Sequence, residues 1–80
     1  MNTTALVEFL VKSIVSNPDM VKIKSFEEDE KTIIEVMVSS EDMKTVIGAN
    51  GKIANAIRTI VKSKAYANGE KKVDINFDTF

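Results

Sequence analysis

Several residue types are missing from this chain of 80 residues, and each absence excludes a class of function. There is no cysteine, so neither a disulfide framework nor thiolate chemistry is available. There is no histidine either, which removes the commonest metal ligand and the usual acid–base residue. Proline occurs once and glycine three times, and with 44% hydrophobic and 29% charged residues the composition is that of a folded domain. We therefore expect a single domain over residues 1–80, with no metal site and no cofactor.

Long apolar runs and converging carboxylates are missing as well. No stretch approaches the ~20 apolar residues that cross a bilayer, and the start lacks a basic region followed by an apolar core. This predicts a cytoplasmic protein without a membrane segment. The run Glu27–Glu30 could attract a cation, but four carboxylates in a link between strands more often form a solvated tip. Because no pair of carboxylates converges, we expect no catalytic residues and no enzyme.

Charge is distributed unevenly along the chain, although the net charge is only −1. Residues 1–43 hold four basic and nine acidic side chains, a net of −5. Residues 44–72 hold seven basic side chains and one acidic side chain, a net of +6. This separation favours a localised site for an anion, although lysines on solvated helix faces would account for the same counts.

Hydrophobic periodicity divides the chain into six elements, three with helical spacing and three with the alternation of strands. The expected helices cover residues 4–16, a short stretch that ends at Gly48, and residues 52–66. The expected strands cover residues 20–26, 31–38 and 71–78, and the acidic link between the first two favours a hairpin. We expect Pro18 to end the first helix and Asn68-Gly69 to end the last one.

The residues that flank the helices suggest which side chains cap the free backbone groups at the helix ends. Thr3 or Thr4 can cap the first helix. Ser39 with Asp42 three residues later fits a capping pattern for the short helix. Gly48 follows that helix at the position where a left-handed residue is expected.

Each expected strand has one apolar face, and each expected helix has one apolar stripe. We therefore predict an α+β fold in the order α-β-β-α-α-β, a two-layer sandwich in which three helices cover one face of a three-stranded sheet. The second strand and the long helix are expected to supply much of the core through Ile34, Val36, Val38, Ile53, Ile57, Ile60 and Val61.

Two glycines, Gly48 and Gly51, interrupt otherwise helical sequence in "MKTVIGANGKIANAIRTIVK". The phosphate loop of nucleotide hydrolases needs four residues before its Gly-Lys-Ser/Thr, whereas two residues separate these glycines and Ile53 follows Lys52. The loop also follows a helix rather than a strand, which excludes a dinucleotide fingerprint as well.

The same loop has the features of a site for a sugar–phosphate backbone. Glycines lack a Cβ, so a ligand can approach the main chain closely. The following helix directs unpaired N–H groups and the positive end of its dipole at the loop, where Lys52 adds a cation. Contacts of this kind hold a nucleic-acid strand without reading its bases. A purely structural tight turn is the alternative.

The segment "VIGANGKIANAIRTIV", residues 46–61, resembles the Gly-x-x-Gly segment of KH domains. The helix–strand–strand prelude matches the type II arrangement. In length, in "SSEDM" and in "NAIRTIV", the chain resembles the small single-domain bacterial KH proteins of the KhpA kind over essentially all of its residues. The resemblance implies one type II KH-like domain over residues 1–80.

The resemblance also implies a function: a shallow groove that holds about four nucleotides of single-stranded RNA, with the loop on the RNA backbone. An RNA chaperone or post-transcriptional regulator is the expected role. Ile47, Ala54 and Ile57 are candidates to support bases, although core packing is the alternative for all three and the better explanation of Ile57. Arg58 and Lys62 could extend the contact with the backbone, and a solvated helix face explains them equally well. The residues expected at the RNA are Lys44, Ile47, Gly48, Ala49, Asn50, Gly51, Lys52, Ala54, Asn55, Arg58 and Lys62.

One departure from the family concerns the middle of the loop. Related loops usually carry a basic residue between the glycines, whereas this chain has Ala49 and Asn50. We therefore expect one copy to bind RNA weakly. The resemblance implies a homodimer, or a heterodimer with a larger RNA-binding protein, with Phe26, Phe80 or the first helix as a candidate interface. A protein-interaction subunit with a weakened RNA site is the alternative function.

Overall fold

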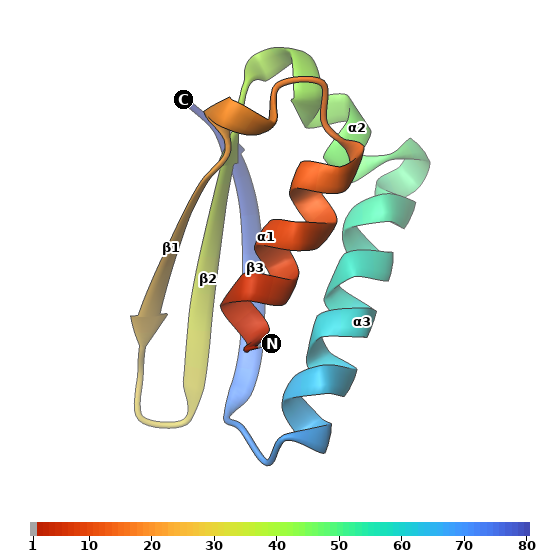
Figure 1. Ribbon diagram of the computed structural model, residues 1–80. Coiled ribbons are helices and arrows are strands. Elements are labelled where there is room, and N and C mark those ends of the chain that lie inside the picture. Colours follow the sequence, from red (N-terminus) through yellow and green to blue (C-terminus); the bar gives the residue numbers. More distant parts are fainter. Residues whose placement is uncertain (1) are drawn as a thin grey trace.

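The computed structural model describes residues 2–80 and has the predicted order α-β-β-α-α-β (Figure 1). Three short 3₁₀ turns lie between these elements, at Pro18–Met20, Ser40–Asp42 and Ala49–Gly51. The helices and strands are α1 (Thr3–Ile14), β1 (Lys22–Glu27), β2 (Lys31–Val38), α2 (Met43–Ile47), α3 (Lys52–Ala67) and β3 (Lys72–Thr79).

The three strands form one mixed sheet in the order β1-β2-β3. β1 and β2 are antiparallel, with Ile23 opposite Val36, as the predicted hairpin requires. β3 returns parallel to β2, with Ile34 opposite Ile75, because α2 and α3 carry the chain back across the sheet. The predicted apolar face of β2 is correct, since Ile34, Val36 and Val38 are fully buried.

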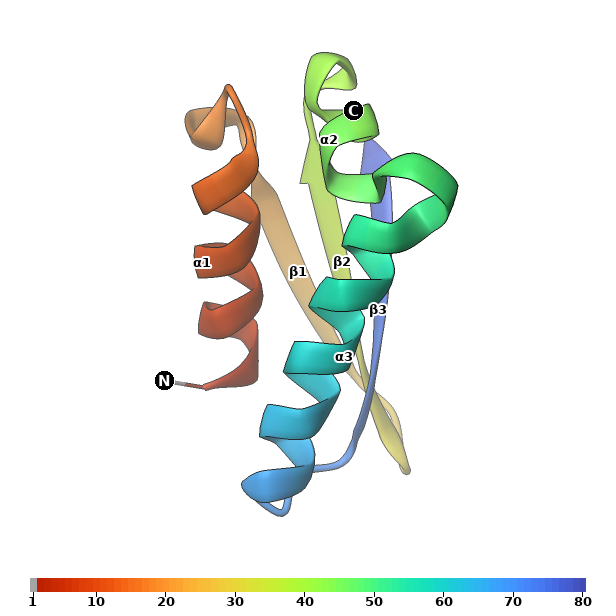
Figure 2. The same cartoon turned by 90° about the vertical axis from the view of Figure 1, so that its right-hand side faces the viewer.

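All three helices cover the same face of the sheet, as the two views in Figures 1 and 2 show. α1 and α3 lie side by side and run in opposite directions, and α2 lies next to the start of α3, near the upper end of the molecule in both views. Within residues 2–80, the other face of the sheet carries no helix. The predicted two-layer α+β sandwich is therefore confirmed. No helix within residues 2–80 has the length and apolar character that a membrane crossing requires.

The cap predicted for the first helix is wrong. Asn2, one residue before the expected threonines, caps α1 by accepting a 2.7 Å hydrogen bond from the Ala5 N–H. Thr3 is instead buried inside the first turn, and its hydroxyl donates to Glu70 at 2.5 Å. α1 ends at Ile14, before the residue expected from Pro18, because Val15 is already extended.

The capping role predicted for Ser39 and Asp42 is also wrong, and Asp42 has a larger structural role. Asp42 is 1% exposed, and its carboxylate accepts hydrogen bonds from the N–H groups of Ser16 at 2.8 Å and Asn17 at 3.0 Å. The Ser39 hydroxyl donates to the same carboxylate at 3.1 Å. These bonds, led by the one from Ser16, hold the pKa of Asp42 below its usual value against the opposing effect of burial. Asp42 thereby fastens the start of α2 to the end of α1.

The core face of α3 differs in part from the predicted stripe. Ala54, Ile57, Val61 and Ala65 are buried, whereas Ile53 is 41% and Ile60 is 49% exposed. The difference has a geometric cause. A helix on an open sheet buries one stripe, and Ile60 lies about 100° around the axis from Val61, outside that stripe.

Candidate functional site

The loop between α2 and α3 contains three residues with positive φ, a backbone conformation that glycine and asparagine adopt most easily. Gly48 has φ +77° and ψ 172°, so it departs from the left-handed helical conformation predicted for it while still requiring positive φ. Asn50 and Gly51 follow with φ +58° and +75°. A Cβ on Gly48 would lie 2.9 Å from the backbone nitrogen of Ile53, so the chain folds back on itself too closely for any side chain there.

The tip of this loop is open. The N–H groups of Gly48 and Gly51 are used within the loop, donating to Lys44 at 2.8 Å and to Gly48 at 3.2 Å. Ala49 and Asn50 are exposed, and their amides have no backbone partner among residues 2–80. Two amide donors therefore stand at the start of a helix of 16 residues, whose dipole adds positive potential at the same place.

A surface hollow adjoins the loop on the side of α2. It encloses about 400 Å³ and is lined by Met43, Lys44, Ile47, Gly48 and Ala49. Met43 and Ile47 are partly buried against the core and leave an apolar floor, whereas Lys44 is exposed. The hollow thus combines an apolar surface, a cation and the open loop amides.

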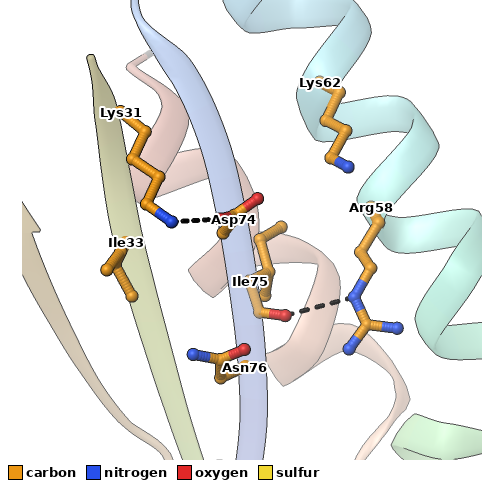
Figure 3. Close-up of a pocket in the computed structure, with 7 residues that line it drawn as sticks. All are labelled: Lys31, Ile33, Arg58, Lys62, Asp74, Ile75 and Asn76. Carbon is orange, nitrogen blue, oxygen red and sulfur yellow. Dashed lines mark hydrogen bonds and ion pairs between the residues drawn. The ribbon is translucent and has the colours of Figure 1, made fainter.

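A second hollow, of about 290 Å³, adjoins α3 on the side of β3 (Figure 3). Arg58 reaches across it from α3. Its Nε donates to the Ile75 carbonyl at 3.1 Å, its Nη1 donates to Asn55 Oδ1 at 3.0 Å, and its guanidinium carbon lies 5.3 Å from the centre of the Phe77 ring. Contacts on three sides hold the guanidinium in one orientation beside the open edge of the sheet.

The fold and the loop geometry agree with the comparison to protein families. Residues 4–77 match the family described as "KhpA/KhpB, KH domain". The chain belongs to this family. The match covers the loop, both flanking helices, β1, β2 and β3 as far as Phe77.

Curated members of the family resemble the chain over most of its length. A protein of Clostridium perfringens named RNA-binding protein KhpA is 46% identical over 68 residues, which are 85% of this chain and 91% of that protein. RNA-binding protein KhpA of Caldanaerobacter subterraneus is 47% identical over 75% of this chain and 80% of that protein. The expectation of a non-enzymatic KH protein agrees with these relatives.

Two solved structures share the fold at low sequence identity. Aquifex aeolicus Era, as a variant bound to GDP.AlF4⁻, matches 98% of this chain with a TM-score of 0.71 and 14% identity. Era in complex with MgGDPNP and nucleotides 1506–1542 of 16S ribosomal RNA matches 96% with a TM-score of 0.66 and 16% identity. This chain spans only 30% and 29% of those proteins, so the likeness concerns one domain of each.

The structure divides the residues expected from the KH resemblance between two places and exposes them unequally: Lys44, Ile47, Gly48 and Ala49 line the hollow beside the loop, whereas Arg58 and Lys62 line the hollow beside β3. Ala54 is only 1% exposed and Ile57 only 5%, and Ile57 belongs to the core cluster. Among the three expected apolar supports, Ile47 therefore offers the most accessible surface. Ile47, Gly48, Gly51 and Arg58 are partly buried, and the exposed members are Lys44, Ala49, Asn50, Lys52, Asn55 and Lys62.

Sequence reasoning missed two residues of this KH site. Met43 lines the hollow beside α2, and Phe77 supports the guanidinium of Arg58 from β3. Phe77 lies within the expected last strand, residues 71–78, and no site role was predicted for it. The signal for Met43 was its spacing of four residues from Ile47, which places both on one side of a helix. No local signal relates Phe77 to Arg58, because their contact depends on how α3 lies on the sheet.

Proposed function

We propose that this KH domain, over residues 1–80, binds short single-stranded RNA and uses the loop between α2 and α3 as its clamp on the RNA backbone. A role as an RNA chaperone or post-transcriptional regulator, without catalysis, follows from this activity. The observation that supports the proposal most is the exposed tip of Ala49 and Asn50, whose amides lack a backbone partner within residues 2–80 at the start of α3. The proposal is also supported by the curated relatives, which are named RNA-binding protein KhpA.

Each part of the site would contact a different part of the RNA. The loop amides and Lys52 suit a phosphate, since amides, helix dipole and ammonium act together there. Lys44 suits the adjoining phosphate from the side of α2. The apolar floor at Ile47 and Met43 suits a base laid against it, as single-stranded RNA presents unpaired bases.

Affinity for RNA should be low and should depend on salt, because no basic residue lies between the glycines. With about three phosphates neutralised, the slope of log affinity against log salt would be about −2. Raising the salt concentration from 50 to 200 mM would then weaken binding roughly twentyfold.

The double substitution Ala49→Asp/Asn50→Asp tests the clamp. Two carboxylates at the open tip should repel a phosphate, so we expect binding of a five-nucleotide RNA to be lost in fluorescence anisotropy. Both residues are exposed, and Asp tolerates the positive φ of Asn50, so the melting curve should change little.

The matched control is Lys22→Ala/Lys24→Ala on β1. Both lysines are exposed, and this variant also lowers the net charge by two. It should keep the affinity of the wild type. Equal affinity of the aspartate variant and the wild type would show that the loop is not the clamp.

Pairing with a second copy, or with a larger RNA-binding protein, is the second candidate function. The observation in its favour is a group of exposed apolar side chains on the helix layer, with Phe9 of α1 at 59%, Ile53 at 41% and Ile60 at 49% exposure. Phe26 and Phe80, the other expected interface residues, are 47% and 63% exposed. Pairing would link two weak RNA sites and raise the effective affinity without any new type of contact.

A further inference from the structure

The dipeptide Asn-Gly occurs twice in the chain. Asn50-Gly51 forms part of the loop before α3, and Asn68-Gly69 follows the end of the same helix. In this dipeptide the backbone nitrogen of the glycine can reach the side-chain amide of the asparagine, because glycine has no side chain in the way. Asparagine is therefore a thermally labile residue, and the two copies can be compared within one molecule.

The two Asn-Gly pairs present the attacking nitrogen in the same way. The Gly51 N–H donates to the Gly48 carbonyl at 3.2 Å, and the Gly69 N–H donates to the Tyr66 carbonyl at 3.1 Å. The ψ angles of the two asparagines are also close, 26° in the loop and −2° after α3. Both nitrogens must therefore be released from one hydrogen bond before they can react, and the glycines do not distinguish the two sites.

The two asparagines are held differently. Asn68 is anchored twice, because its N–H donates to the Lys64 carbonyl at 3.0 Å and its side-chain amide donates to Glu70 Oε2 at 2.7 Å. Asn50 is exposed, and within residues 2–80 neither its N–H has a backbone partner nor its side chain a hydrogen-bond partner. The rotation that brings side chain and backbone together therefore breaks two bonds of Asn68 that Asn50 does not make.

We propose that Asn50 is a site of spontaneous deamidation, and that the carboxylate produced there weakens the hold of the loop on RNA. The reactivity of Asn50 is inferred from the loop alone, whereas the effect on RNA rests on the proposed function. The exposed tip of the clamp would thus lose affinity for RNA as the protein ages.

The reaction requires only water. The Gly51 nitrogen gives up its proton and bonds to Asn50 Cγ, while the bond from Cγ to Nδ2 breaks and ammonia leaves. Water then opens the five-membered imide at either of the two bonds to its nitrogen, which leaves aspartate or isoaspartate at position 50. Nothing is oxidised or reduced, and one neutral amide becomes one carboxylate.

The new carboxylate would stand at the place proposed for a phosphate. Ala49 and Asn50 are both exposed, so no other side chain would separate the two negative charges. Repulsion between like charges about 4 Å apart in water corresponds to a loss of affinity of about fivefold. The same carboxylate lies at the start of α3, where the helix dipole favours an anion, so the fold itself should not be weakened.

The test keeps the protein in warm, mildly alkaline buffer, which favours loss of the Gly51 proton. Mass spectrometry of its peptides then measures deamidation at each asparagine separately. Asn50 should react at least about tenfold faster than Asn68, since two further hydrogen bonds hold Asn68. In fluorescence anisotropy, the aged protein should bind a five-nucleotide RNA about fivefold more weakly, with an unchanged melting curve. An excess of this RNA during ageing should slow the reaction at Asn50 but not at Asn68.

Asn50→Gly is the matched control, because it has no amide to lose and glycine accepts the positive φ of this position. Its affinity for RNA should not change with age. Asn50→Asp reproduces one product and should bind RNA about fivefold more weakly without ageing. Reaction at Asn68 as fast as at Asn50 would overturn the inference, and so would an equal loss of affinity in aged Asn50→Gly and aged wild type.

The variant Ala49→Asp/Asn50→Asp separates this inference from the proposed function. Loss of RNA binding in that variant, with no deamidation at Asn50 in the aged wild type, would leave the clamp and refute the modification site. Unchanged binding in that variant, together with fast deamidation at Asn50, would refute the clamp and with it the effect of the modification on RNA.

Discussion

The two glycines of the loop meet different physical requirements. Gly48 is required by space and conformation together, because a Cβ there would meet the backbone of Ile53 at 2.9 Å and its φ and ψ lie in a region almost confined to glycine. Gly51 is required by conformation alone, since a Cβ would meet only Asn55 Nδ2 at 3.7 Å. Gly48 therefore allows the close approach of the loop to Ile53, whereas Gly51 supplies a left-handed residue at a place where the surface beside α3 is open.

This difference predicts unequal costs of substitution. Gly51→Ala should lower the free energy of unfolding by about 1–2 kcal/mol, the usual cost of a left-handed alanine. Gly48→Ala should lower it by more than about 3 kcal/mol, because Ile53 and the start of α3 must also move. Urea denaturation of both variants measures the two costs. A cost for Gly48→Ala equal to or below that of Gly51→Ala would contradict the role assigned to the contact with Ile53.

Among the elements, α3 contributes both to the core and to two candidate binding surfaces. One face of it is core, one flank carries Arg58 and Lys62 toward β3, and the opposite flank carries the exposed Ile53 and Ile60. The two flanks are about 140–180° apart around the helix axis, so RNA and a second protein could occupy them at the same time.

If the apolar flank is a pairing surface, a charge at its centre should separate the copies. We expect Ile60→Glu to convert a dimer into a monomer in sedimentation velocity, because an unpaired carboxylate would be buried in the interface. Affinity for a five-nucleotide RNA should not change, since this flank faces away from Arg58. Thr59→Glu, an exposed neighbour outside this flank, is the matched control and should leave the dimer intact. A monomeric wild type would refute pairing between identical copies.

Local patterns predicted the elements better than the contacts between them. The bounds of β2 were predicted without error, because β-branched residues with strict alternation leave few alternatives. The loop was also found, since its residue types are required locally. The hydrogen bonds of Asp42 to Ser16 and Asn17 were not, because they join residues 25 and 26 positions apart. The contact between Arg58 and Ile75 was missed for the same reason.

In the whole molecule, carboxylates fasten both ends of α1. Asp42 accepts from the N–H groups of Ser16 and Asn17 just after the helix. Glu70, in the link between α3 and β3, accepts from the hydroxyl of Thr3 in its first turn. The Thr3 hydroxyl, then the amide of Asn68, and the charge of Lys64 hold the pKa of Glu70 below its usual value. The protein therefore attaches α1 to the rest of the fold by two groups that titrate in acid.

The direction of these shifts determines how stability depends on pH. A lowered pKa in the folded protein means that the unfolded chain binds protons more readily, so both carboxylates stabilise the fold above their ordinary pKa of about 4. That stabilisation is lost as the pH falls below about 4 and through the lowered values. The urea midpoint should be nearly constant from pH 7 to 5 and should drop steeply toward pH 2.5. Asp42→Asn should be less stable than the wild type at pH 7, because an amide cannot accept all of these hydrogen bonds, and its midpoint should fall less in acid. Parallel pH profiles of the two proteins would show that Asp42 does not hold α1 through its charge.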